Sequence, residues 1–127
     1  MTSREKHSHL NGNMGLMPGA VGLFTYDVQS GITIGNGLDQ AIWGLSEDED
    51  YNFERAKQAV HKDYRQKFHD FSLGSIGKET SVEFELVLEN GYRTLERYEI
   101  IGHEEDNAIT SSPIIITGST TLLEKVA

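Results

Sequence analysis

The order of the segments along the chain constrains its fold more than any single motif. Alternating apolar residues predict two short strands at 21–28 and 32–34, joined by a turn at 29–31. Helical spacing follows up to about residue 71, and further strands are expected at 82–88, 92–101 and 108–117. We therefore predict an α+β fold with one five-stranded antiparallel sheet and short helices inserted between strands 2 and 3.

Local signals mark where the helices and one hairpin should begin. The expected N-caps of three helices are Asn36, Asn52 and Asp63. In the third helix, Tyr64, Phe68 and Phe71 fall on one face, which is typical of a core stripe and, alternatively, of a ligand-contacting wall. Asn90-Gly91 predicts a two-residue type I′ hairpin turn, because both residues tolerate positive φ.

The composition along the chain suggests three parts. Residues 1–20 are rich in Gly, Asn and His, and this predicts a flexible N-terminal tail or linker. Residues 21–121 contain all the predicted elements and form the domain. Residues 122–127 are interpreted as the start of a C-terminal connector, in which Leu122 and Leu123 would pass a signal onward.

Composition excludes several classes of function. The chain has no cysteine, so disulfides, thiolate metal sites, cysteine nucleophiles and cysteinyl flavin adducts are ruled out. With 11 basic against 20 acidic residues and a net charge of −9, nucleic acid is not an expected partner. No apolar stretch approaches the ~20 residues that span a bilayer, and the first residues lack the core of a signal peptide. We expect a cytoplasmic protein without membrane contact.

Taken together, these segments resemble a PAS domain of the kind common in bacterial sensor proteins. The resemblance covers about residues 16–125. It rests on the opening strand and turn at 22–31, on Trp43-Gly44-Leu45-Ser46, on the helix junction Val60-His61-Lys62-Asp63-Tyr64-Arg65, on the hairpin at 84–91 and on the closing strand at 114–125. Lys62 replaces the usual proline of the junction. Ser119-Thr120-Thr121 stands where the family often has Asp-Ile-Thr.

The resemblance raises the question of a cofactor. His61 and His69 are the candidate axial haem ligands, and His69-Asp70 is similar to the His-Asp pair of haem-binding PAS oxygen sensors. Here His69 lies five residues after Tyr64 instead of four, which rotates its side chain by about 100° and gives Phe68 the ligand's direction. Because no cysteine exists, a flavin could bind only non-covalently. We therefore expect no cofactor, with haem and non-covalent flavin as alternatives.

The resemblance implies a sensory module without catalytic activity of its own. Its partners would be a small ligand and an output domain such as a histidine kinase or a diguanylate cyclase, and it would form a homodimer. The expected ligand pocket lies between the sheet and the helices and is lined by Ile42, Trp43, Phe68, His69, Phe71, Phe84 and Tyr98. A ligand-free homodimerisation or protein-interaction module is the alternative. No catalytic motif points to an enzyme, and no metal site is expected.

Overall fold

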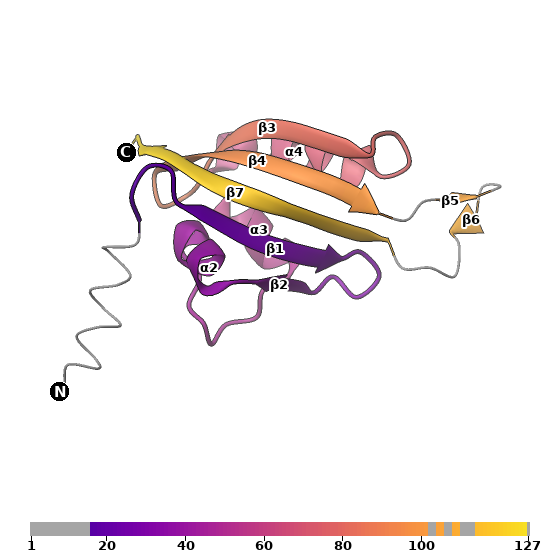
Figure 1. Cartoon of the computed structure of the whole chain (residues 1–127), viewed down its shortest axis with the longest axis horizontal. Helices are drawn as coiled ribbons and strands as arrows, with labels where there is room; N and C mark the ends of the chain where they lie inside the picture. Colours follow the sequence, from indigo (N-terminus) through magenta and orange to yellow (C-terminus); the bar gives the residue numbers. More distant parts are fainter. Residues whose placement is uncertain (1–15, 102–103, 106–107, 110–113, 127) are drawn as a thin grey trace.

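The computed structural model of the chain describes residues 16–101, 104–105, 108–109 and 114–126. Its main sheet has five antiparallel strands in the order β2-β1-β7-β4-β3 (Figure 1). They are β1 (Val21–Asp27), β2 (Thr33–Gly35), β3 (Ser81–Val87), β4 (Tyr92–Ile101) and β7 (Ile115–Lys125). A separate pair joins β5 (Glu104–Glu105) to β6 (Ala108–Ile109). The predicted fold class is confirmed.

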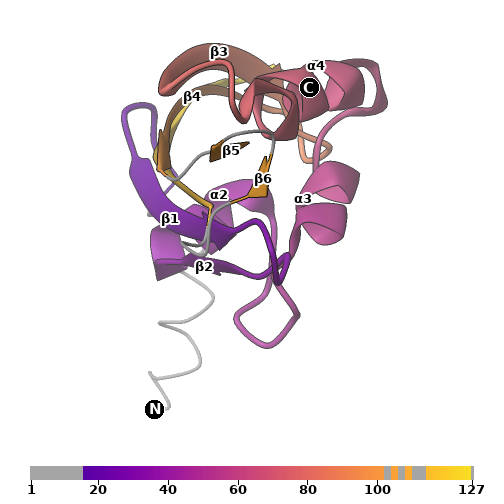
Figure 2. The ribbon, with the colours of Figure 1, turned by 90° about the vertical axis from the view of Figure 1, so that its right-hand side faces the viewer.

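The helices follow β2 in the chain and lie against one face of the sheet (Figures 1 and 2). They are α2 (Gly37–Trp43), α3 (Phe53–Ala59), the 3₁₀ turn η1 (Lys62–Tyr64), α4 (Arg65–Phe71) and the 3₁₀ turn η2 (Leu73–Ser75). None of the helices that the structure describes has the length and apolar character needed to cross a membrane. The predicted insertion of short helices between the second and third strands is confirmed.

Two of the three predicted helix caps are confirmed. The side-chain oxygens of Asn36 and Asn52 each accept a hydrogen bond of 2.8 Å from the backbone N–H three residues further on. The cap predicted at Asp63 is wrong. The chain first makes the turn η1, where His61 Nδ1 accepts from the Asp63 N–H at 3.2 Å, and α4 begins only at Arg65.

The hairpin between β3 and β4 is longer than the predicted two-residue turn. Leu88 N–H donates to the Tyr92 carbonyl at 2.8 Å, which leaves three residues, 89–91, in the loop. Gly91 takes the left-handed conformation with a φ of 92°. A three-residue loop that ends in a left-handed glycine is a common alternative to the type I′ turn, and it uses the same Asn-Gly signal.

The chain boundaries expected at 20 and 122 do not match the described structure. Gly19 N–H donates to the Leu122 carbonyl at 2.7 Å, and Leu122 N–H donates to the Ala20 carbonyl at 2.8 Å. Leu16 also packs on the core, so residues 16–20 are part of the fold, while the rest of the predicted tail lies outside the described residues. Strand β7 continues to Lys125, beyond the expected strand end at 117.

Leu122 and Leu123 therefore lie inside the sheet and do not begin a connector. Leu122 is 2% exposed and belongs to the core, whereas Leu123 is half-buried. Leu122 pairs with Thr94 of β4, and the register shifts at Leu123, because the next paired residue of β7 is Glu124. Their predicted role in signal output stays a prediction.

A glycine in β7 leaves space for two aromatic rings over the middle of the sheet. A Cβ placed on Gly118 would lie 2.4 Å from the Arg97 carbonyl oxygen and 2.8 Å from Cδ1 of Tyr98. Because Gly118 has no side chain, Phe24 of β1 and Tyr98 of β4 meet edge to face with their ring centroids 5.0 Å apart. These two rings form the sheet side of the site described next.

Candidate functional site

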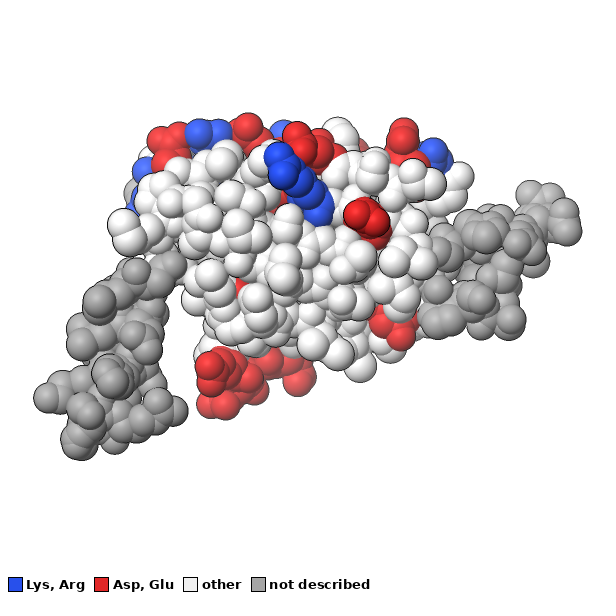
Figure 3. All heavy atoms as spheres, in the orientation of Figure 1, with Lys and Arg blue, Asp and Glu red and all other residues white. Residues whose placement is uncertain are grey.

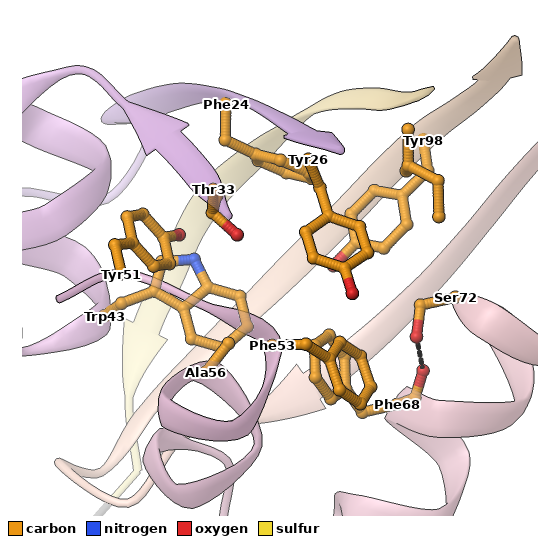
Figure 4. Close-up of a pocket in the computed structure, with 11 residues that line it drawn as sticks. Phe24, Tyr26, Thr33, Trp43, Tyr51, Phe53, Ala56, Phe68, Ser72 and Tyr98 are labelled. Atoms are coloured by element: carbon orange, nitrogen blue, oxygen red, sulfur yellow. Dashed lines mark hydrogen bonds between the residues drawn. The ribbon is translucent and has the colours of Figure 1, made fainter. Parts of the chain in front are cut away.

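A small cavity lies between the sheet and helices α3 and α4 (Figure 4). Its volume is about 30 Å³. The residues that line it are mostly aromatic or apolar: Phe24, Tyr26, Thr33, Trp43, Tyr51, Phe53, Ala56, Phe68, Ser72, Tyr98 and Ile116. They come from β1, β2, β4 and β7 on one side and from the helical segments on the other, so both layers of the domain contribute to one site.

Ring contacts hold the helical wall of the cavity together. Phe53, at the start of α3, stacks on Phe68 of α4 with centroids 5.2 Å apart and an interplanar angle of 12°. Trp43 packs against Phe68 at 5.7 Å, and Tyr26 of β1 reaches Phe53 at 5.9 Å. Aromatic pairs at such separations stabilise their mutual position beyond simple burial. Phe53 and Phe68 thus join α3 and α4 into one wall.

The cavity is too small for haem or a flavin, the two cofactors that the PAS resemblance suggested as alternatives. A volume of about 30 Å³ is enough for a water molecule. Pockets for drug-sized ligands are roughly 300–1,000 Å³. The side chains, as arranged, therefore do not fit haem or a flavin. Among the described residues, no group of three or more His, Asp or Glu side chains is placed to hold a metal ion.

Three of the seven residues predicted to line the pocket do line the cavity: Trp43, Phe68 and Tyr98. Ile42 is fully buried but does not line the cavity, and its carbonyl accepts a 2.9 Å hydrogen bond from Asn90 Nδ2. Phe71 and Phe84 form a separate stacked pair with centroids 5.0 Å apart, and Phe71 is 38% exposed. Neither lines the cavity, although Phe84 meets the lining residue Tyr98 edge to face with centroids 5.1 Å apart.

His69 also lies outside the cavity. Its side chain is 45% exposed, and its Nδ1 lies 3.6 Å from Asp70 Oδ1. Phe68 points inward in its place and is 4% exposed. Because His69 lies one residue later than the haem ligand of the similar sensors, Phe68 faces the interior instead, as predicted. His61, the second histidine considered for haem, caps η1 with its Nδ1.

Sequence reasoning missed several lining residues for an identifiable reason. Tyr51 and Ser72 lie next to helix ends in irregular segments, where apolar periodicity defines no inward face. Phe53 and Ala56 follow helical spacing, but that spacing alone does not separate a cavity wall from a filled core. Thr33 lies on β2, a strand of three residues that is too short for its alternation to be decisive.

Three of the lining side chains connect the cavity to polar groups buried behind it. Trp43 Nε1 donates to Thr120 Oγ1 at 3.0 Å. The Tyr51 hydroxyl donates to Asp39 Oδ2 at 2.6 Å, and the Tyr98 hydroxyl donates to Glu96 Oε1 at 2.9 Å. Burial, followed by the nearby carboxylates, raises the pKa of both tyrosines, so they stay protonated donors. The cavity is thus apolar inside and hydrogen-bonded behind its wall.

Comparison with known proteins gives similarity at the level of structure. No protein-family model matches the chain, and no curated protein matches it in sequence. Among solved structures, it is similar to a domain of a histidine kinase from Haloarcula marismortui that is assigned to light and redox sensing. The TM-score is 0.67 at 17% identity, and the match covers 84% of this chain and 91% of that one.

Two further structures share the arrangement. The N-terminal domain of a diguanylate cyclase with a PAS/PAC sensor from Marinobacter aquaeolei matches with a TM-score of 0.56 at 10% identity, over 80% of this chain and 94% of that one. A sensory box histidine kinase/response regulator from Burkholderia thailandensis matches with a TM-score of 0.51 at 13% identity, over 91% and 83%. Strand order, helix insertion and these similarities agree: the chain has a PAS-type fold.

Proposed function

We propose that the chain is the sensory module of a signal-transduction protein, and that it acts on an output domain such as a histidine kinase or a diguanylate cyclase. The PAS-type fold supports this proposal, since the similar structures are domains of such kinases and cyclases. The output segment would be the end of β7, because it contacts the first described residues through Leu122. A change in the sheet would therefore reach both ends of the domain.

The cavity supports a small apolar ligand as the signal. Its inner surface is almost wholly aromatic and aliphatic, and the polar atoms of Trp43, Tyr51 and Tyr98 are engaged behind the wall. Apolar cavities of about 150 Å³ bind xenon or benzene, so even xenon would have to widen this smaller one. A larger ligand would have to separate Phe53 from Phe68, which would move α3 relative to α4. That displacement is the conformational change by which binding would be sensed.

Native mass spectrometry and amide NMR of the purified protein test this proposal. We expect xenon to shift the amide signals of residues around the cavity, and any co-purified ligand to add mass under native conditions. Ala56→Leu should abolish the xenon response by filling the cavity, whereas Ala41→Leu, on a helix position outside the lining, should keep it. An unchanged spectrum under xenon, with the mass of the polypeptide alone, would overturn the ligand proposal.

The second candidate function is homodimerisation, and one surface favours it. The face of the sheet opposite the helices exposes apolar side chains, among them Val21 (42% exposed), Leu23 (56%) and Ile101 (53%). Figure 3 shows acidic and basic side chains along the margin at β3 and acidic ones at the lower margin, with few charges over the middle of this face. A second copy of the chain could cover this surface.

Sedimentation across a range of concentrations tests the dimer. Leu23→Asp should shift the protein to the monomer, because it places a charge in the middle of the proposed interface. Met17→Asp is the matched control, since Met17 is 65% exposed but lies in the segment before β1. If Met17→Asp alone disrupts the dimer, the interface lies at the N-terminal segment. A wild-type monomer at every concentration would exclude this function.

A further inference from the structure

Two carboxylates lie in the interior of the domain. Asp39 on α2 and Glu96 on β4 are both 0% exposed. Acidic side chains are almost never fully buried unless a partner compensates for their charge. The ion pairs of the described residues all involve other carboxylates, and no lysine, arginine or histidine of the described part of the chain pairs with either group. The negative charges of Asp39 and Glu96 must therefore be offset in another way.

Hydroxyl groups surround Glu96. Thr94 Oγ1 donates to Oε2 at 2.6 Å, while the Tyr98 hydroxyl and Thr120 Oγ1 donate to Oε1 at 2.9 and 2.7 Å. The cross-strand neighbours of Glu96 are Phe84 on β3 and Thr120 on β7, so neither adjacent strand supplies a cation. Three hydroxyl donors favour a negative charge on Glu96, but none of them neutralises it.

The carboxylate of Asp39 accepts fewer hydrogen bonds than that of Glu96. The Tyr51 hydroxyl donates to Oδ2 at 2.6 Å, but Oδ1 is buried and has no hydrogen-bond partner among the described residues. The backbone packs closely around it, because a Cβ on Gly22 would lie 2.3 Å from Asp39 Cα and a Cβ on Gly35 would lie 2.5 Å from Oδ2. An ionised Asp39 would thus hold a negative charge in a tight site, with a direct hydrogen bond from Tyr51 and with the Trp43 and Thr120 side chains close by.

The two carboxylates influence each other through shared neighbours. Trp43, one turn after Asp39 on α2, donates to Thr120 Oγ1, and Thr120 in turn donates to Glu96. Burial raises the pKa of Asp39 to about 6. Burial is also the main cause that raises the pKa of Glu96 to about 7, and the negative charge of Asp39 adds to it. The titratable groups that face the pair are Tyr51 and Tyr98, which stay neutral.

We propose that Asp39 and Glu96 form one buried proton-binding site, which takes up a proton near neutral pH and makes the domain responsive to pH. Loss of this proton leaves two negative charges in the core, one on α2 and one on the inner strand β4. Their repulsion acts on the contact between Trp43 and Thr120, which holds α2 to β7. Thr120 lies two residues before Leu122, so the response reaches the end of β7.

Carbon-detected NMR titration of the side-chain carboxyl groups tests the site in the unmodified protein. We expect the Asp39 and Glu96 signals to titrate between about pH 5.5 and 7.5, each showing the influence of the other. Asp39→Asn should lower the midpoint of Glu96, because it removes a like charge and preserves the shape of the side chain. Glu96→Gln should change the midpoint of Asp39 less, because Glu96 is still mostly neutral when Asp39 ionises. Trp43, the single tryptophan of the chain, should change its fluorescence over the same pH range.

Glu99→Gln is the matched control, because Glu99 is an exposed glutamate on the same strand. It should leave both midpoints and the Trp43 transition unchanged. The proposal is overturned if both carboxyl groups of the wild-type protein titrate below pH 5, or if neither substitution moves the midpoint of the other group. The titration of the wild-type protein tests the two midpoints even if a variant does not fold. Neither the NMR titration nor the Trp43 fluorescence depends on the proposed ligand or output domain.

Discussion

Gly22 shows how a single atom limits the packing of α2 on the sheet. A Cβ at this position of β1 would overlap the backbone of Asp39, with 2.3 Å to Cα and 2.7 Å to N, and backbone cannot rotate aside as a side chain can. Gly22→Ala should therefore destabilise the domain by about 1–3 kcal/mol, the usual cost of overpacking. Urea unfolding followed by circular dichroism measures this change.

Gly37→Ala is the control for that substitution. Gly37 is the first residue of α2, nothing lies within 4 Å of an added Cβ, and alanine favours a helix. This variant should be as stable as the wild-type protein or slightly more stable. Equal stability of the two alanine variants would contradict the close approach of α2 to β1.

The sequence of β4 also explains why the burial of a single residue, Glu96, could not be predicted. Residues 92–101 contain apolar and charged side chains at both odd and even positions, so alternation does not assign one face to the core. The structure buries Glu96 and half-exposes its neighbour Leu95. The hydroxyls of Thr94, Tyr98 and Thr120 make that choice of face favourable, and Thr120 lies on β7, which is distant in sequence.

At the scale of elements, strand β7 makes the clearest prediction about register. Leu122 is 2% exposed in the core, while Leu123 is half-buried and is skipped where the pairing with β4 shifts register. Leu122→Ala should cost about 2–5 kcal/mol of unfolding free energy, since it leaves a cavity in the core. Leu123→Ala should cost about 1 kcal/mol or less because it removes little buried area. Chemical denaturation of both variants measures the difference, and a larger loss from Leu123→Ala would refute the register.

The elements themselves could largely be predicted from the sequence, because local signals determine them. Asn36 and Asn52 cap helices with their own side chains, and these contacts span only three residues. The end of β7 could not be predicted in the same way. Its last residues pair with β4 and with the segment before β1, so their conformation depends on contacts about 30 and 100 residues away in sequence. The same holds for the cavity, whose walls come from four strands and three helical segments.

At the scale of the whole molecule, the buried pair predicts how stability depends on pH. The pKa values of Asp39 and Glu96 rise from 3.8 to about 6 and from 4.5 to about 7 on folding. The folded state therefore binds protons more tightly than the unfolded state. Their contribution to stability is complete below about pH 4 and is lost as the pH rises to about 7. Most proteins with paired surface carboxylates show the opposite trend over this range.

We predict that the melting temperature of the wild-type protein falls between pH 5 and pH 8. A rise in pKa of about two corresponds to about 3 kcal/mol, so the loss amounts to a few kcal/mol when both groups ionise. Glu96→Gln should flatten this dependence and should be more stable than the wild-type protein at pH 8, because glutamine remains neutral when buried. Glu99→Gln should keep the wild-type slope. Differential scanning calorimetry at several pH values measures both, and a melting temperature that rises with pH in the wild-type protein and in Glu96→Gln alike would show that these carboxylates are not the groups that bind the proton.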